Sequence, residues 1–183
     1  MTKALIIVDV QNDYFPGGSM ELVGMDAAAS CCQQLLQSFR TQQLAIFHIQ
    51  HLSTRPGASF FVPDTPGADI HHSLQPAAGE AHIVKHFPSA FRDTDLNELL
   101  QLSGIGELVI CGAMSHMCID TTVRAAFDHG YECRVIADAC ATRDLEFNGH
   151  QVAAVDVQAA FMAALSLPFA QVLSCADYLA ANS

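Results

Sequence analysis

Three residues with complementary chemistry each follow a short apolar run of the sequence. Asp9 follows the run ALIIV, Lys85 follows AHIV, and Cys118 follows ELVIC after a brief turn. A carboxylate, an amine and a thiol are the groups needed to attack a carbonyl carbon and to move the proton of the attacking thiol. Each also has an ordinary structural explanation, as a turn-capping carboxylate, a solvated lysine and a packed thiol. Their chemistry therefore depends on whether the fold brings them together.

The apolar runs alternate with stretches whose composition favours helices. Six runs rich in branched aliphatic residues predict strands buried on both faces, at residues 4–8, 44–49, 81–84, 107–111, 133–137 and 170–174. Helices are predicted between them, with Asp26 and Asp95 as N-caps, Gly104 and Gly130 as end signals, and a long helix from about Asn148 to Leu165. This alternation predicts one three-layer α/β/α domain over residues 1–183, with a mainly parallel sheet.

The three reactive residues are expected to meet at one edge of this sheet. Open parallel sheets bind ligands beyond the carboxyl ends of their strands, and Asp9, Lys85 and Cys118 all follow predicted strands. Cys118 also opens a helical stretch that ends at Gly130, and the N-terminus of a helix favours a thiolate. A nearby Lys85 would favour the anion further. The pattern therefore predicts a reactive cysteine at a catalytic edge.

A proline-rich segment from about residue 52 to residue 79 interrupts the alternation, with four prolines and three glycines. A loop of this length in a compact domain is usually a lid or a binding loop, although an irregular connection is the alternative. Phe60 and Phe61 in this loop, with His116 and Met117 beside the nucleophile, are candidate walls of a slot for a small planar substrate. Ordinary loop packing is the competing interpretation of these side chains.

Charge and composition exclude several classes of partner. Eight Lys and Arg against 19 Asp and Glu give a net charge of -11, which disfavours binding to nucleic acid or to an anionic membrane. No apolar run is long enough to span a bilayer, and the first residues lack the features of a signal peptide, so we expect a cytoplasmic protein. Seven cysteines without a CxxC pair argue against a disulfide framework and a zinc ribbon.

Four segments of the sequence resemble the isochorismatase-like cysteine hydrolases, which include nicotinamidases and N-carbamoylsarcosine amidases. The segments are LIIVDVQNDYFPGG at 5–18, HIVKHFPSAFRDTDLNELL at 82–100, LVICGAMSHMCIDTTVRAAFDHGY at 108–131 and VIADACATRD at 135–144. The first three carry the acid, the lysine and the cysteine of that family in order and in context. The resemblance implies a six-stranded parallel sheet flanked by helices, and a catalytic triad of Asp9, Lys85 and Cys118.

The resemblance also implies a cis peptide bond between Ala113 and Met114. The backbone N–H groups of Met114 and Cys118 are then the expected donors to the oxyanion that forms on a substrate carbonyl. Asp9 is expected to accept the thiol proton and later to deliver it to a leaving amine, before water hydrolyses the thioester.

The nine histidines are candidate metal ligands. Nicotinamidases of this family commonly hold a metal with an Asp-x-His pair after the second strand, where this sequence has HIQH, with Ile49 in place of the acid. In an extended segment His48 and His51 point to opposite faces, which suits chelation poorly. His71 and His72 fall in the loop, where we expect them to be solvated or to face the substrate. We therefore expect no metal and no cofactor.

These observations predict a cysteine-dependent hydrolase of a small amide, carbamoyl or related carbonyl substrate that acts through a covalent thioester. One alternative is hydrolysis of the isochorismate vinyl ether, which needs no nucleophilic thiol. The other is a redox-sensing thiol protein, although Asp9 and Lys85 speak against it because a sensor needs no proton shuttle. The expected partners are a small-molecule substrate and further copies of the chain, as a dimer or a tetramer.

Overall fold

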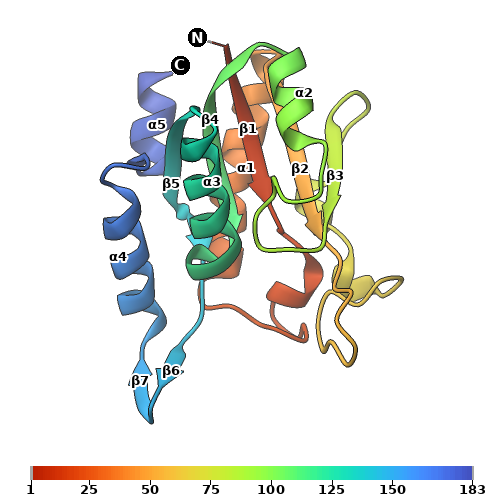
Figure 1. Ribbon diagram of the computed structural model, residues 1–183, viewed down its shortest axis with the longest axis vertical. Helices are drawn as coiled ribbons and strands as arrows, with labels where there is room; N and C mark the ends of the chain where they lie inside the picture. The colour runs from red at the N-terminus through yellow and green to blue at the C-terminus, as the bar shows by residue number, and fades with distance from the viewer. Residues whose placement is uncertain (1, 183) are drawn as a thin grey trace.

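A six-stranded parallel sheet runs through the middle of the molecule (Figure 1). The computed structural model describes residues 2–182, and the strands of this sheet lie in the order β3-β2-β1-β4-β5-β8. Every neighbouring pair in this order is parallel. The six strands are β1 (Thr2–Val8), β2 (Ala45–His51), β3 (Ala81–Lys85), β4 (Ile105–Ala113), β5 (Glu132–Ala141) and β8 (Gln171–Leu173). They occupy the six predicted apolar runs, so the predicted parallel sheet is confirmed.

Helices cover both faces of the sheet because its strands present apolar side chains on both sides. Along β1, Leu5 and Ile7 belong to one buried cluster, and Ile6 and Val8 belong to the other. The two clusters are covered by different helices, the first by α1 (Met25–Thr41) and α5 (Cys175–Ala181), the second by α2 (Leu96–Leu102), α3 (Asp120–Asp128) and α4 (Ala154–Leu165). This is the predicted three-layer α/β/α arrangement. Among residues 2–182, every helix is too short or too polar to span a lipid bilayer.

A β-hairpin replaces the first part of the long helix that was predicted from about Asn148. Strands β6 (Leu145–Phe147) and β7 (His150–Val152) pair antiparallel, and α4 begins only at Ala154. Asn148 and Gly149 form the two-residue turn with φ angles of 52° and 75°. Asn-Gly is a preferred sequence for such a turn because both positions need positive φ. The hairpin projects beyond the carboxyl ends of the sheet strands (Figure 1).

The two predicted N-caps also differ in detail from the structure. Helix α1 begins after Gly24, so Asp26 lies in the first turn and not at the N-cap. Asp95 does hold the N-cap position of α2, but its side chain makes no capping hydrogen bond. An acidic side chain in the first turn still interacts favourably with the positive end of the helix dipole.

Close approach of β1 and β4 depends on Gly112. Val8 pairs with Gly112 at the ends of the two strands. Gly112 has a φ of 121°, and a Cβ atom at this position would lie 2.0 Å from the carbonyl oxygen of Val8. Only glycine fits there. The residues that follow both strands are consequently held next to each other.

Candidate active site

Asp9, Lys85 and Cys118 lie together at the carboxyl end of the sheet. Lys85 Nζ is 2.8 Å from Asp9 Oδ2 and 3.2 Å from Cys118 Sγ. The side chains of Asp9 and Lys85 are fully buried, and Cys118 is 4% exposed. The structure therefore brings together the three residues that follow the predicted strands.

Each of the three residues is placed by the end of a different strand. Asp9 follows β1 directly, has a left-handed φ of 52°, and donates its backbone N–H to the carbonyl oxygen of Ile49. Lys85 is the last residue of β3. Cys118 lies in η4 (Ser115–Ile119), a π-helical turn that leads from β4 into α3. Left-handed backbone at a non-glycine residue and π-helical turns are both frequent at functional sites.

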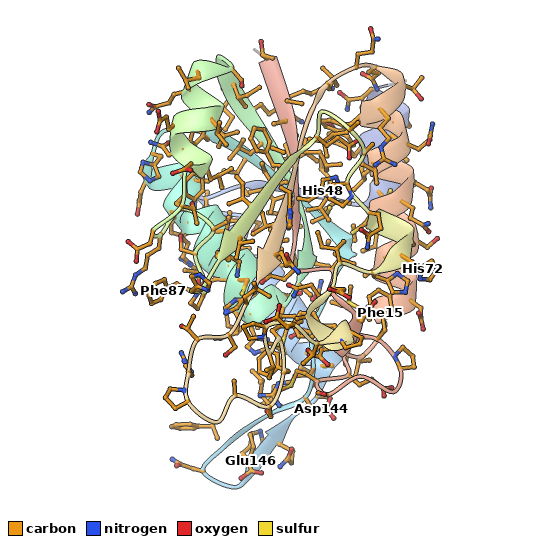
Figure 2. The ribbon with its side chains drawn as sticks, turned by 90° about the vertical axis from the view of Figure 1, so that its right-hand side faces the viewer. Phe15, His48, His72, Phe87, Asp144 and Glu146 are labelled. Atoms are coloured by element: carbon orange, nitrogen blue, oxygen red, sulfur yellow. The ribbon has the colours of Figure 1, made fainter. Side chains whose placement is uncertain are left out.

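His51, the last residue of β2, is a fourth member of the cluster. Its Nδ1 lies 3.0 Å from Lys85 Nζ and 3.9 Å from Asp9 Oδ2. Because an ammonium group only donates hydrogen bonds, His51 Nδ1 is the acceptor and the neutral ring carries its proton on Nε2. His48 lies within the sheet layer (Figure 2), where its Nε2 is 2.8 Å from Glu80 Oε2. The two histidines point in different directions, as predicted, but the place of His51 beside the lysine was not predicted.

Burial and the neighbouring carboxylate keep the proton on Cys118. Burial raises the pKa of the Cys118 thiol and Asp9 raises it further, while Lys85 opposes them only in part. Burial alone would lower the pKa of Lys85, but Asp9 and Cys118 more than offset this effect, so the pKa of Lys85 is raised. Burial and Asp9 thus oppose the thiolate that the helix N-terminus and Lys85 were expected to favour. Asp9 and Lys85 form an ion pair beside the sulfur.

The cluster has the ligand types of a metal site but already contains a cation. Asp9, His51 and Cys118 offer ligand atoms that lie within 4.8 Å of one another. Lys85 Nζ is within 3.2 Å of an atom from each of these three residues. A metal ion between them would meet strong repulsion from the buried ammonium group. The residues of this site do not fit a bound metal.

A cavity of about 280 Å³ opens over Cys118. Phe60 and Met117, two of the predicted wall residues, line it together with Tyr14 and Met114. The peptide bond that precedes Met114 is cis. The volume lies near the lower end of the range for small-molecule sites, which is about 300 to 1,000 Å³. The cavity therefore suits a small substrate.

The other two predicted wall residues, Phe61 and His116, lie outside the cavity wall. Phe61 is 1% exposed, and its ring centroid is 4.6 Å from that of Tyr14. The buried carboxylate of Asp13 accepts the backbone N–H of Phe61 at 2.7 Å, and this contact helps to hold Phe61 in the core. His116 instead contacts Thr142, with 2.6 Å between Nδ1 and Oγ1. Packing thus explains these two side chains better than substrate contact does.

His72 lies at the side of the molecule beside α1 (Figure 2), and His71 directly precedes it in the chain. The His71 ring stacks on Phe15 with centroids 3.7 Å apart, and its Nδ1 is 2.8 Å from Ser73 Oγ. Neither histidine is among the residues that line the cavity over Cys118. The expectation that these histidines face the substrate is not supported, and His71 has a structural role.

Gln11 and Asp13 are buried polar residues that hold the surroundings of the site in place. Gln11 Oε1 accepts the backbone N–H of His51 at 2.8 Å, and its Nε2 donates to the carbonyl oxygens of His51 and Ala68. Asp13 holds the backbone of Phe61, as described above. The sequence DVQND contains a pattern that indicates both residues, because Asp9, Gln11 and Asp13 alternate along it and would point to the same side of an extended segment. Sequence reasoning assigned neither residue a role.

The buried position of His51 predicts a loss of stability in acid. Burial and then Lys85 lower the pKa of His51 from 6.5 to about 4. Between these values the unfolded chain binds a proton that the folded chain does not, so the free energy of unfolding falls as the pH is lowered from 7 to 4. The contribution of His51 reaches roughly 3 kcal/mol at most. Urea denaturation across this pH range should show a smaller fall for His51→Gln than for the wild type.

The matched control for that experiment is His72→Gln, which removes an exposed histidine outside the site. Other histidines with lowered pKa values, such as His48, add to the slope of both proteins and cancel in the comparison. Equal slopes for the wild type and His51→Gln would contradict the assignment of the lowered pKa to His51.

The chain is similar to a known protein family and to solved structures. The isochorismatase domain model matches residues 3–177. The uncharacterized isochorismatase family protein YddQ of Bacillus subtilis is 49% identical over 98% of this chain and 99% of its own length. The nicotinamidase/pyrazinamidase of Mycobacterium tuberculosis is 33% identical over 76% of this chain and 86% of its own length. A crystal structure assigned as an isochorismatase hydrolase from Oleispira antarctica is 50% identical, with a TM-score of 0.94 over 98% of this chain and 96% of that chain.

Proposed function

The chain belongs to the isochorismatase family, and we propose that it is a cysteine-dependent hydrolase of a small amide, carbamoyl compound or related carbonyl substrate. The observation that carries this proposal is the position of Lys85, whose ammonium group contacts both the Asp9 carboxylate and the Cys118 thiol beside a small cavity. The similarity to a nicotinamidase/pyrazinamidase supports the choice of an amide.

In the proposed first step, Asp9 takes the proton of Cys118 while the sulfur attacks the carbonyl carbon. The raised pKa of Cys118 makes a positioned base necessary, because little free thiolate exists near neutral pH. A side-chain hydrogen bond joins Cys118 and Asp9, so the carboxylate is in place to accept the thiol proton. The backbone N–H groups of Met114 and Cys118 are the proposed donors to the oxyanion.

In the proposed second step, the C–N bond of the tetrahedral intermediate breaks and a thioester remains on Cys118. The protonated Asp9 returns its proton to the leaving nitrogen, which departs as ammonia or an amine. Water then attacks the thioester carbonyl, and Asp9 takes one proton of that water. The acid product leaves as the proton returns to the Cys118 sulfur. Lys85 stays charged and keeps Asp9 and Cys118 in position throughout both steps.

The structure disfavours the redox-sensing alternative. Oxidation of a cysteine by peroxide requires thiolate character and access to solvent. The raised pKa of Cys118 lowers the share of thiolate in the resting protein, which works against oxidation by peroxide. Vinyl ether hydrolysis remains as a competing activity of the same cavity, and it is separable because it needs no covalent bond to sulfur.

A substrate panel read by two methods tests the proposal. The panel contains nicotinamide, pyrazinamide, N-carbamoyl amines and isochorismate, with ammonia or product release as the first readout. The second readout is intact-protein mass spectrometry after rapid acid quenching, and we expect an added acyl mass on the peptide that contains Cys118. Turnover of isochorismate alone, without any acyl adduct, would replace the amidase proposal with vinyl ether hydrolysis.

A further inference from the structure

The proline-rich loop places a cation beside the reactive cysteine. The loop segment from residue 53 to residue 60 forms one side of the cavity, and Arg55 is one of its lining residues. From this placement we propose that Arg55 determines specificity by binding a carboxylate group of the substrate, so that the substrate is a small anionic amide or carbamoyl compound. This inference rests on the proposed hydrolase function and adds the substrate class.

Arg55 is one of two cations for which the structure of residues 2–182 shows no hydrogen bond or ion pair with an acid or amide side chain. The chain has eight Lys and Arg against 19 Asp and Glu. Six of the eight have a side-chain hydrogen bond or an ion pair with an acid or amide side chain, namely Lys3, Arg40, Lys85, Arg92, Arg124 and Arg134. Within residues 2–182, the guanidinium groups of Arg55 and Arg143 make neither a hydrogen bond nor an ion pair with an acid or amide side chain. Of these two, only Arg55 lines the cavity.

The cavity wall contains no acidic side chain that would compete for Arg55. Its lining includes Arg55, two histidines and two serines, but no Asp or Glu. Asp9 lies fully buried beside the cavity, where the ammonium group of Lys85 neutralises its charge. The local charge of the site is therefore positive although the chain as a whole carries a net charge of -11. The negative net charge of the chain repels an anionic substrate at longer range. A cation in the cavity wall is therefore needed to attract such a substrate.

Apolar side chains also line the cavity, which limits the form of the substrate. Tyr14, Phe60 and Met117 contribute rings and a thioether, and the volume is about 280 Å³. A guanidinium group binds a carboxylate through two parallel hydrogen bonds, which fixes orientation as well as position. The matching ligand is a short molecule with a hydrolysable amide at one end, a brief apolar middle and a carboxylate at the other end.

Matched substrate pairs test this assignment. Succinamate and N-carbamoyl-β-alanine carry the carboxylate, while pentanamide and butylurea replace it with an ethyl group of similar size. We expect the wild type to prefer the anionic member of each pair. In Arg55→Gln the ratio of kcat/KM values, anionic over neutral, should fall by about 10- to 100-fold, mainly through KM, because a charged hydrogen-bond pair is lost. Arg55→Lys should restore part of the ratio, since lysine keeps the charge without the paired geometry.

Lys3→Gln is the control for net charge. It removes the same charge at the end of β1 opposite to Asp9, and Lys3 does not line the cavity, so the ratio should stay at the wild-type value. A ratio that is unchanged in Arg55→Gln, or that falls equally in both variants, would overturn the role of Arg55.

Binding to the Cys118→Ala variant provides a readout that does not depend on turnover. Calorimetric titration with succinamate should give a Kd that weakens by about 10- to 100-fold when Arg55→Gln is added. Absence of any difference would refute the inference. Hydrolysis of neutral amides through Cys118, with no preference for anions, would refute only the Arg55 assignment. Full amidase activity in Cys118→Ala would instead refute the proposed function.

Discussion

Replacing Cys118 with alanine should lower kcat for amide hydrolysis by about 10⁴-fold or more, while the protein stays folded. The proposed acyl intermediate forms on the Cys118 sulfur, and no other thiol replaces it because the remaining cysteines do not line the cavity. Alanine removes one sulfur atom from a nearly buried site, so the effect on stability is small compared with the effect on rate. The measurement is ammonia release, with circular dichroism and urea denaturation as checks of folding.

Cys133→Ala is the matched control for this experiment. Cys133 is also buried and belongs to the same apolar cluster as Cys118, but it lies in β5 and does not line the cavity. Its removal should leave kcat within about two-fold of the wild type and lower stability modestly. Wild-type turnover by Cys118→Ala on a substrate that the wild type hydrolyses would show that the thiol is not the nucleophile.

Replacing Asp9 with asparagine should damage both activity and stability. Without the carboxylate, nothing accepts the thiol proton during attack, so kcat should fall by about 10³-fold. The Lys85 ammonium group then remains fully buried without its anionic partner, which lies 2.8 Å away in the wild type. Breaking one side of a buried ion pair costs about 3 to 5 kcal/mol of unfolding free energy. Initial rates and urea denaturation of the same preparation measure the two effects.

The double variant Asp9→Asn with Lys85→Met separates catalysis from stability. Methionine is close to lysine in size and carries no charge, so the buried unpaired ammonium is removed and much of the lost stability should return. Activity should not return, because both the base and the positioning cation are absent. Recovery of hydrolysis along with stability would mean that Asp9 serves the fold alone.

The positions of the six sheet strands along the chain followed from the sequence because they depend on local patterns. Runs of branched aliphatic residues marked all six sheet strands, and the rule that ligands bind beyond the carboxyl ends of parallel strands placed Asp9, Lys85 and Cys118 at one edge. The hairpin at Asn148 and Gly149 also has a local signal, since Asn-Gly is a preferred hairpin turn, but the helical composition of this segment predicts a longer helix.

Other features of the site depend on contacts that no local pattern encodes. His51 joins the cluster because the ends of β2 and β3 lie side by side, so that its ring meets Lys85. Phe61 lies in the core because a buried Asp13 holds its backbone. The raised pKa of Cys118 depends on how completely the fold excludes water from the sulfur. Each of these is a property of the assembled structure.

Because of the order of the strands, activity can be used to measure the folding of this protein. The four groups of the cluster come from the ends of four successive neighbours, β3, β2, β1 and β4, although the residues extend from Asp9 to Cys118 along the chain. No short segment contains the site, and pairings between segments so distant in sequence form slowly. During synthesis Cys118 is the last of the four groups to emerge from the ribosome. The rate at which hydrolysis recovers after dilution from urea therefore measures the rate at which these four strands pair in the sheet.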